Sequence, residues 1–482
     1  MMHISYQSIL KLKLLGGNAM KKKLVLALLS TSILSTMLAG CKVSTDTGAT
    51  NTSSTSETTD TAKSDDSADT ASTTEATGNE EEITWMFWDD LTATEDLITK
   101  GYKEVIDRFN DQYKGQYHVN VITTNLEEYD TKLNALIAAG DTPDLFICNP
   151  GPNLTQYVTS GVAADLTDIL QNQEKDWYDT FSDGIFEKIT YDGKIMAVPT
   201  CFAAACVFYN TEIFDKAGIA APPETFTELL EDCQKIKDAG FAPISCSANT
   251  AWCLSMVAGY LCDREGGPDN LQGITDGTLD WTSESFIKAG YDLKELSAYF
   301  QETAVGDSND QATANFYNGE AGMLIQGSWA IGQINGNNPE FEDKCGVFRF
   351  PGIEGGADPN RMIVKTDNLV MSATTEHKDA CIALMKQFTD DTAQKYIAEV
   401  GGKIPVTGVD FDTNKAPKQL SYVKDILATT TGTFGFYNES LASVEAGDTF
   451  DNAMVEIFLG TATPEEAFQK VQDYYDKNVR NK

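Results

Sequence analysis

Between residues 83 and 148 the chain alternates between two spacings of apolar residues. Short apolar or alternating runs predict buried strands, and these runs are Ile83–Trp88, His118–Thr123 and Asp144–Cys148. Apolar residues three and four positions apart predict amphipathic helices, and the two stripes are Ile98, Tyr102, Val105, Ile106 and Phe109, then Tyr129, Leu133, Leu136 and Ile137. Strands that alternate with helices indicate right-handed crossovers, an α/β fold and mostly parallel sheets.

The pattern continues through the rest of the chain. Two further strands are predicted, at Ile195–Pro199 after a turn and at Ala203–Tyr209. Capping-box spacing predicts the start of two helices, because Thr225 precedes Glu228 by three residues and Thr463 precedes Glu466 by three. Single helices are predicted for Phe286–Phe300 and Asp379–Val400.

A different pattern precedes this region. Three lysines at 21–23 are followed by an apolar run from Leu24 to Leu38 and then by Ala39-Gly40-Cys41. The run fits a secretory signal and is short of the roughly 20 residues that span a bilayer. The segment resembles a bacterial lipobox, which implies cleavage before Cys41 and lipidation of its thiol. An ordinary signal peptide with an incidental cysteine is the alternative, and Met20 is a candidate start of translation.

Residues 42–82 are almost entirely Ser, Thr, Asp, Glu, Ala and Gly. So few apolar residues cannot offset the entropy of ordering the chain, so a disordered tether is expected. Mucin-like decoration is the alternative interpretation.

The charge of the chain excludes one class of partner. The formal net charge is −36. Residues 1–40 contain lysines but no acidic residue, so a chain cleaved before Cys41 would be more negative still. Such a surface repels phosphate backbones, which argues against nucleic acid as a partner.

Nine cysteines follow Cys41, and none forms a Cys-x-x-Cys pair. An odd number without metal-ligand spacing argues against a disulfide scaffold or a zinc ribbon. Most of these thiols are expected to be small buried apolar groups, and one disulfide between Cys201 and Cys206 is left open.

About 400 residues follow the tether, too many for one core, so two lobes are expected. Several stretches resemble, in this order, the extracellular solute-binding proteins of ABC importers, in the family that contains maltose-binding protein. Besides Ile83–Trp88 they are Ala138–Asp144, Asp192–Pro199, Tyr209–Gly218, Pro222–Phe226, Phe316–Met323 and Gly327–Trp329.

The resemblance implies a two-lobed, type II periplasmic-binding-protein-like fold with the ligand held between lobes joined by hinge strands. By analogy, lobe 1 comprises 83–199 and 363–408, and lobe 2 comprises 200–362 and 409–482. The implied protein is a monomer anchored by lipid to the extracytoplasmic face of the bacterial membrane. It captures a carbohydrate, expected to be an oligosaccharide, and delivers it to the permease subunits of an ABC transporter.

Candidate ligand-binding residues combine family position with chemistry, because aromatic rings suit the C–H face of a sugar and polar groups suit its hydroxyls. Trp329 occupies the position of a stacking aromatic in the family, and Trp252 follows a stretch that often contacts ligand. A core position is the alternative for each tryptophan. The other candidates follow predicted strands, lie at the expected hinge or lie in an aromatic loop: Trp88, Asp89, Asp90, Asn149, Asp367, Asn368, Phe436 and Tyr437.

Two departures from maltose-binding protein limit the analogy. Its cleft tryptophan after the third strand falls here near Cys148, and an acidic contact falls near Ala203. Maltodextrin specificity is therefore not carried over.

An enzyme is not supported by the sequence. His118 and His377 lack metal-ligand spacing, no Gly-x-Ser-x-Gly elbow or glycine-rich nucleotide loop occurs, and no catalytic residue, metal or cofactor is expected. A glycan-degrading surface enzyme and a sensory or adhesive glycan-binding lipoprotein are the alternatives to a transport receptor.

Overall fold

The computed structural model describes residues 80–92 and 94–480. The predicted signal segment, the lipidation site Cys41 and nearly all of the predicted tether lie outside these residues. Among the residues that are described, no helix is long and apolar enough to cross a membrane.

The first part of the fold follows the predicted order of strands and helices. The elements are β1 (Glu81–Phe87), α3 (Leu97–Gln112), β2 (Tyr117–Thr123), α4 (Tyr129–Ala139) and β3 (Leu145–Cys148). Strand β1 pairs in parallel with both β2 and β3, as the strand–helix alternation predicts. Helix α4 ends at Gly140, whose φ of +84° is the left-handed conformation that glycine adopts at helix ends.

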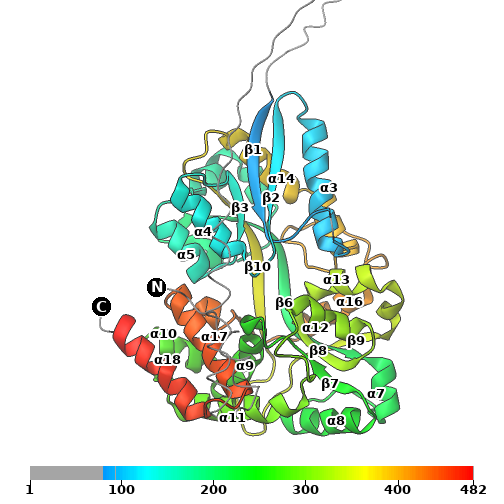
Figure 1. The fold of residues 1–482 in the computed structure, drawn as a ribbon. Helices are drawn as coiled ribbons and strands as arrows, with labels where there is room; N and C mark the ends of the chain where they lie inside the picture. The colour runs from blue at the N-terminus through cyan, green and yellow to red at the C-terminus, as the bar shows by residue number, and fades with distance from the viewer. Residues whose placement is uncertain (1–79, 93, 481–482) are drawn as a thin grey trace, which may run out of the picture. The chain divides into compact units, whose positions relative to one another are not determined.

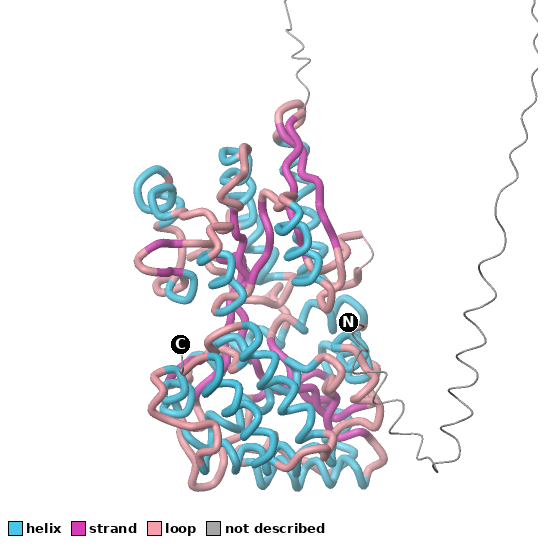
Figure 2. The backbone as a smooth tube through the Cα atoms, turned by 60° about the vertical axis from the view of Figure 1, so that its left-hand side comes forward, coloured by secondary structure: helices cyan, strands magenta, loops and turns pink. Residues whose placement is uncertain are grey.

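Two long strands connect the halves of the molecule (Figures 1 and 2). Strand β6 (Val198–Asn210) and strand β10 (Arg361–Met371) pair in antiparallel fashion at the centre of a sheet with the order β2-β1-β3-β10-β6-β8-β7. The predicted strands around residues 195–199 and 203–209 are thus mainly one strand, β6. Cys201 and Phe202 continue the pairing with β10 beyond a register shift that skips Thr200, so the strand bulges there but does not end.

The prediction of mostly parallel sheets is corrected. Strand β10 runs antiparallel to β3, and β6 runs antiparallel to β8 (Ala321–Gly327) and β9 (Cys345–Phe348). A strand that arrives from the other half of the molecule enters a sheet in the opposite direction to the strands joined by local crossover helices. Parallel pairing persists where helices make the connections, as between β7 (Ala242–Ser245) and β8.

The apolar residues form separate cores on either side of these strands. One core contains residues between Ile83 and Cys201 and between Leu369 and Val406, and we call this half the first lobe. Two further clusters contain buried apolar residues between Ala204 and Ile363 together with C-terminal residues, and we call that half the second lobe. The fold is therefore the two-lobed α/β architecture that the resemblance implies, while the exact lobe boundaries stay a prediction.

The predicted helix over residues 379–400 is wrong in one respect, because it is two helices, α14 (Lys378–Phe388) and α15 (Asp391–Glu399). Asp390 has extended backbone angles and accepts a hydrogen bond from the amide of Ala393 at 2.9 Å, so it caps α15 and ends the continuous helix. Both predicted capping boxes are present, at Thr225 and Thr463.

The remaining elements complete the two lobes. The first lobe adds α5 (Pro152–Thr159), α6 (Lys175–Tyr178) and the hairpin of β4 (Thr190–Tyr191) and β5 (Lys194–Ile195). The second lobe adds α7 (Thr211–Ala217), α8 (Phe226–Asp238), α9 (Ala251–Gly266), α10 (Pro268–Thr275), α11 (Glu284–Leu296), α12 (Asn309–Tyr317), α13 (Ala330–Asn337), α16 (Lys418–Ala428), β11 (Gly432–Phe434), α17 (Val444–Phe458) and α18 (Pro464–Asn478).

The cysteines behave as the composition predicts. All nine cysteines of the described residues are buried and free, including Cys201 and Cys206. These two lie five residues apart on β6 and therefore face opposite sides of the strand, which rules out the disulfide that the sequence left open.

Candidate functional site

A cavity of about 820 Å³ lies where the two lobes face each other. Its first-lobe walls come from the carboxyl ends of β1, β2 and β3, and its second-lobe walls come from the segments after β7 and β8 and from α12 and α17. Ligands of parallel α/β sheets bind beyond the carboxyl ends of the strands, so this cavity is the candidate binding site.

Three aromatic rings form one wall of the cavity on the second lobe. The ring centroids of Trp252 and Trp329 are 6.1 Å apart, those of Trp252 and Phe436 are 6.2 Å apart, and those of Trp329 and Phe436 are 5.9 Å apart. The tryptophans are partly exposed, whereas Phe436 is 3% exposed. Such a wall offers flat apolar faces to a ligand.

The sequence Gly327-Ser328-Trp329 explains how the second tryptophan is held. The indole of Trp329 folds back over Gly327, where a Cβ atom would lie 2.0 Å from the ring. Ser328 is fully buried, and its amide donates a hydrogen bond to the carbonyl oxygen of Ala204 on β6 at 2.9 Å. Glycine therefore provides the space for the ring, and the serine hydroxyl, which accepts a hydrogen bond from the amide of Ala204 at 3.3 Å, helps to fix the turn to the central strand.

Lys365 of β10 lies between the aromatic residues of the two lobes. Its ammonium nitrogen is 5.7 Å from the ring centroid of Trp88 in the first lobe and 5.7 Å from that of Trp329 in the second. It also donates a hydrogen bond to Oδ1 of Asn149 at 2.8 Å. Both ring distances are within the range of cation–π attraction, so one side chain contacts both walls.

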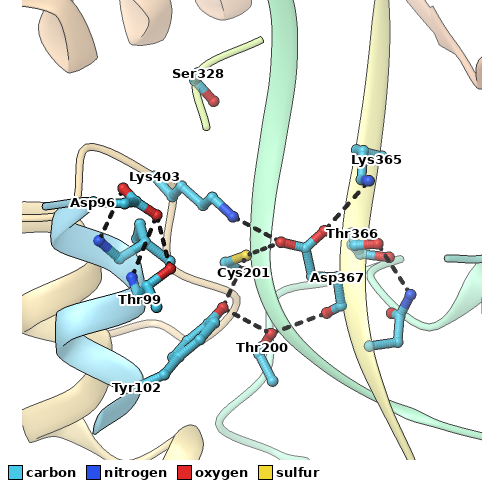
Figure 3. Close-up of polar contacts among 12 residues, drawn as sticks. Asp96, Thr99, Tyr102, Thr200, Cys201, Ser328, Lys365, Thr366, Asp367 and Lys403 are labelled. Carbon is cyan, nitrogen blue, oxygen red and sulfur yellow. Dashed lines mark hydrogen bonds and ion pairs between the residues drawn. The ribbon is translucent and has the colours of Figure 1, made fainter. Parts of the chain in front are cut away.

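A buried ion pair in the cavity joins Asp367 of β10 to Lys403, which lies in the loop after α15 (Figure 3). The ammonium of Lys403 is 2.7 Å from Oδ2 of Asp367, and that of Lys365 is 3.5 Å from Oδ1. Burial alone would raise the pKa of Asp367, but the two lysines hold it well below its usual range. Asp367 is therefore charged, and it neutralises part of the charge of both lysines.

Three uncharged side chains complete this polar network. The thiol of Cys201 donates to Oδ2 of Asp367 at 3.1 Å, and Thr200 donates to the carbonyl oxygen of Asp367 at 3.1 Å. The hydroxyl of Tyr102 lies 3.3 Å from Oγ1 of Thr200. Burial, and then the charge of Asp367, raise the pKa of Cys201 to about 11, so this thiol is a hydrogen-bond donor and not a nucleophile.

The structure brings most of the sequence candidates to this one cavity. The candidates that line it are Trp88, Asp89, Asn149, Trp252, Trp329, Asp367 and Phe436. Asp89 is held by Thr99, whose hydroxyl donates to Oδ2 at 2.9 Å. The binding roles of these residues stay predictions.

The other three candidates do not line the cavity. Asp90 is exposed and accepts a hydrogen bond from the amide of Thr92. Asn368 is fully buried on the face of β10 opposite to Asp367 and donates to the carbonyl oxygen of Cys148 at 3.1 Å. Tyr437 is 1% exposed and packs against Phe450 in the core of the second lobe.

Several cavity residues were missed by sequence reasoning. Lys365 had a signal, because residues two apart on a strand share a face and Asp367 was already a candidate. No sequence signal marked the other three, because only the fold brings their distant segments to the cavity: Lys403, Glu439 and Asp451.

The second lobe contributes two partly or fully buried carboxyl groups. Asp451 accepts hydrogen bonds from the hydroxyl of Ser255 and from Nδ2 of Asn438, the latter at 3.1 Å. Burial raises the pKa of Asp451 to about 7. Glu439 accepts a hydrogen bond from Nδ2 of Asn149 at 3.0 Å, which is a direct contact between the lobes.

The arrangement is suited to binding. Aromatic faces and hydrogen-bonding groups from both lobes surround one space, and the described residues contain no group of His, Cys, Asp and Glu side chains that could hold a metal ion. A ligand that contacts both walls would hold the lobes together.

Comparison with known proteins agrees with this geometry. The family described as bacterial extracellular solute-binding protein matches residues 95–403. A probable sugar-binding periplasmic protein of Mesorhizobium japonicum is 26% identical over 58% of this chain and 67% of its own length. A multiple sugar-binding protein of Streptococcus mutans is 24% identical over 63% of this chain and 72% of its own.

A solved structure has the same fold. It comes from work on xylan utilisation by Caldanaerobius polysaccharolyticus and superposes with a TM-score of 0.75 at 25% identity, covering 81% of this chain and 99% of the other. The members compared are substrate-binding proteins rather than enzymes, which confirms the expectation of a binding protein, and the family acts outside the cytoplasm. With its family match, its two lobes and its interlobe cavity, this chain belongs to the bacterial extracellular solute-binding proteins of ABC transporters.

Proposed function

We propose that this protein is the lipid-anchored receptor of an ABC importer, and that it captures an oligosaccharide between its lobes and delivers it to the membrane permease. The observation that carries the proposal is the wall of three aromatic rings facing polar side chains across the cavity. Two of the relatives are named as sugar-binding proteins, and such a wall suits the C–H face of a sugar ring.

Capture depends on closing the two lobes. A ligand that contacts Trp329 on one lobe and Trp88 or Asn149 on the other gains contacts in the closed form that the open form lacks. Its binding therefore shifts the population toward the closed form, which the permease recognises.

Anchoring is assigned to Cys41 from the lipobox resemblance. Two or more acyl chains give a stable membrane anchor, and the tether expected from the sequence after Cys41 would keep the receptor near its permease at high local concentration. Mass spectrometry of the protein purified from membranes tests this assignment. The expected result is an N-terminal peptide that begins at an acylated Cys41, and a Cys41→Ser variant is expected to be released from the membrane.

A thermal-shift screen with a library of sugars tests the ligand class. A ligand at 100 times its dissociation constant adds about 2.7 kcal/mol of stability, which raises the melting temperature by several degrees. We expect at least one oligosaccharide to produce such a shift. If oligosaccharides produce no shift while polyols or amino acids do, the carbohydrate assignment is wrong.

A further inference from the structure

The cavity is strongly acidic. Among the described residues that line it, ten carry a carboxyl group and two are lysines. Both lysines contact the same carboxylate, that of Asp367, at 2.7 and 3.5 Å. Most of the negative charge of the cavity therefore has no positive partner within it.

Four of these carboxyl groups gather at one place, which we call the acidic end. They are Asp130 of the first lobe and Glu439, Asp448 and Asp451 of the second. Asp130 on α4 and Asp448 on α17 line the same cavity, so the acidic end includes side chains from both lobes. Burial and then the charge of Asp448 raise the pKa of Asp130. None of the four forms an ion pair with a lysine or arginine of the described residues. Burial raises the pKa of Glu439, and the charge of Lys365 only partly opposes this effect.

Asp451, a buried member of the acidic end, has no cationic partner among the described residues. Asp451 is 9% exposed, and its two hydrogen-bond donors, Ser255 and Asn438, are both neutral. Oδ1 of Asn438 is itself buried and accepts no hydrogen bond from the described residues. A buried carboxylate without a cation is costly, so Asp451 keeps its proton up to about pH 7. A cation bound beside it would stabilise the charged form and release that proton.

The cavity already accommodates an ammonium group elsewhere. The side chain of Lys365 places its nitrogen 5.7 Å from the centroids of both Trp88 and Trp329. Tryptophan faces attract cations through the ring quadrupole, as carboxylates do through their charge. The walls therefore combine the two kinds of group that recognise amines.

We propose that the ligand is an amino sugar oligosaccharide, with a protonated amine at the acidic end and its sugar rings against the tryptophans. This inference rests on the proposed function and narrows it to a chemical class. Acidic and phosphorylated sugars are excluded by repulsion from the same carboxylates.

Titration calorimetry at pH 6 with three oligosaccharides of equal length tests the proposal. The probes are glucosamine tetramer with free amines, its fully N-acetylated counterpart, and galacturonic acid tetramer. We expect the free amine to bind at least about tenfold more tightly than the acetylated sugar, as for a charged hydrogen bond. The uronic acid is expected not to bind, and added salt is expected to reduce the preference for the amine.

Variants connect the preference to the acidic end. Glu439→Gln combined with Asp451→Asn is expected to bring the amine and its acetylated counterpart to within about threefold of each other. Glu445→Gln is the control, because Glu445 is exposed on the same helix as Asp451 and does not line the cavity. Near-ultraviolet circular dichroism establishes that each variant is folded.

The outcomes separate the two proposals. Equal or tighter binding of the acetylated or acidic sugar overturns the amine assignment and leaves the sugar receptor in place. Binding of a linear polyamine such as spermidine, with no sugar bound, supports the acidic end and overturns the carbohydrate assignment. If no sugar and no amine binds, both proposals are overturned.

Discussion

At the scale of single residues, a small side chain often decides where a large one can lie. Gly327 is the clearest example, since any side chain there would displace the indole of Trp329 that folds over it. The sequence pattern marks Trp329 as important, but the reason that Gly327 precedes it is visible only in the structure.

Replacing Trp329 tests the aromatic wall. Trp329→Ala is expected to weaken binding of the ligand by about 1–3 kcal/mol, or roughly 5- to 150-fold, as for a buried aromatic anchor. Calorimetry measures the change. Tyr422→Ala is the matched control, because Tyr422 is 42% exposed on α16 and lies outside the cavity. Equal affinities of the two variants for the ligand would contradict the prediction that Trp329 binds it.

Removing one partner of the ion pair between Lys403 and Asp367 is expected to destabilise the protein more than removing both. Lys403→Met leaves the buried carboxylate of Asp367 without its nearest partner, which costs about 3–5 kcal/mol of unfolding free energy. The double variant with Asp367→Asn removes both charges and is expected to recover much of this loss. Urea unfolding measures both effects, and a single variant as stable as the parent would contradict the prediction.

Asp451 gives stability a dependence on pH. Burial raises its pKa in the folded state to about 7, against 3.8 for an ordinary aspartate. Because the folded state binds this proton more tightly than the unfolded state, the protonated side chain adds to the free energy of unfolding. This added stability is complete below about pH 4 and is lost as the pH rises through 7.

The Asp451→Asn variant has no ionisable group at this position, so its unfolding free energy should not fall with rising pH for this reason. Compared with the parent, its unfolding free energy is expected to improve by about 3–4 kcal/mol between pH 4 and pH 8. Urea titrations at both pH values measure the change, with Glu445→Gln as a control that should follow the parent. A pH profile identical to that of the parent would show that Asp451 titrates normally.

At the scale of elements, apolar spacing predicts the existence of strands and helices better than their ends. The stripe over residues 379–400 keeps a helical period across the break between α14 and α15, so spacing alone reports one helix. The break depends on Asp390, which caps α15 and also pairs with Arg108 on α3. That second contact lies 282 positions away in the sequence, and no local pattern contains it.

The cap at Asp390 is testable. Asp390→Ala removes the hydrogen bond to the amide of Ala393 and the partner of Arg108, and is expected to lower the unfolding free energy by about 1–2 kcal/mol. Asp391→Ala, one residue later and exposed, is expected to change it by less than about 0.5 kcal/mol. The order of the two effects is the measured outcome, and a larger loss for Asp391→Ala would contradict the cap.

At the scale of the whole molecule, the lobes touch at points beside the cavity where only glycine fits. A Cβ at Gly151 would lie 1.9 Å from the carbonyl oxygen of Glu439, and one at Gly336 on α13 would lie 1.9 Å from that of Glu95. Gly332, one turn earlier on α13, faces the carboxylate of Asp96 in the same way. The lobes therefore approach each other through backbone contacts.

Gly336→Ala is expected to prevent this approach and to leave the cavity residues unchanged. We expect ligand affinity to fall by at least about fivefold, because the closed form becomes less populated, and small-angle scattering with ligand to report a larger radius of gyration. Gly306→Ala is the control, since its Cβ would have ordinary contact at 3.6 Å. A Gly336→Ala variant that closes and binds like the parent would contradict the prediction.

Most of the candidate residues chosen from the sequence line the cavity. They were chosen because they lie at the ends of predicted strands or at positions that bind ligand in the family. Trp88 ends the first predicted strand, Asn149 follows the third, and Trp329 follows its glycine and serine. The acidic end was not predictable, since Asp130 and Asp451 lie on elements far apart in sequence and each resembles an ordinary surface carboxylate. With so many acidic residues in the chain, only the fold distinguishes these from the rest.

The central position of β10 has a consequence for the order in which the two lobes can fold during synthesis. Strand β10 pairs with β3 of the first lobe, yet it begins at residue 361, after most of the second lobe has been synthesised. The N-terminal lobe therefore cannot complete its sheet while the ribosome is still translating the middle of the chain. The sheet of the first lobe is therefore completed only when residues 361–371, which follow most of the second lobe in the chain, have been synthesised.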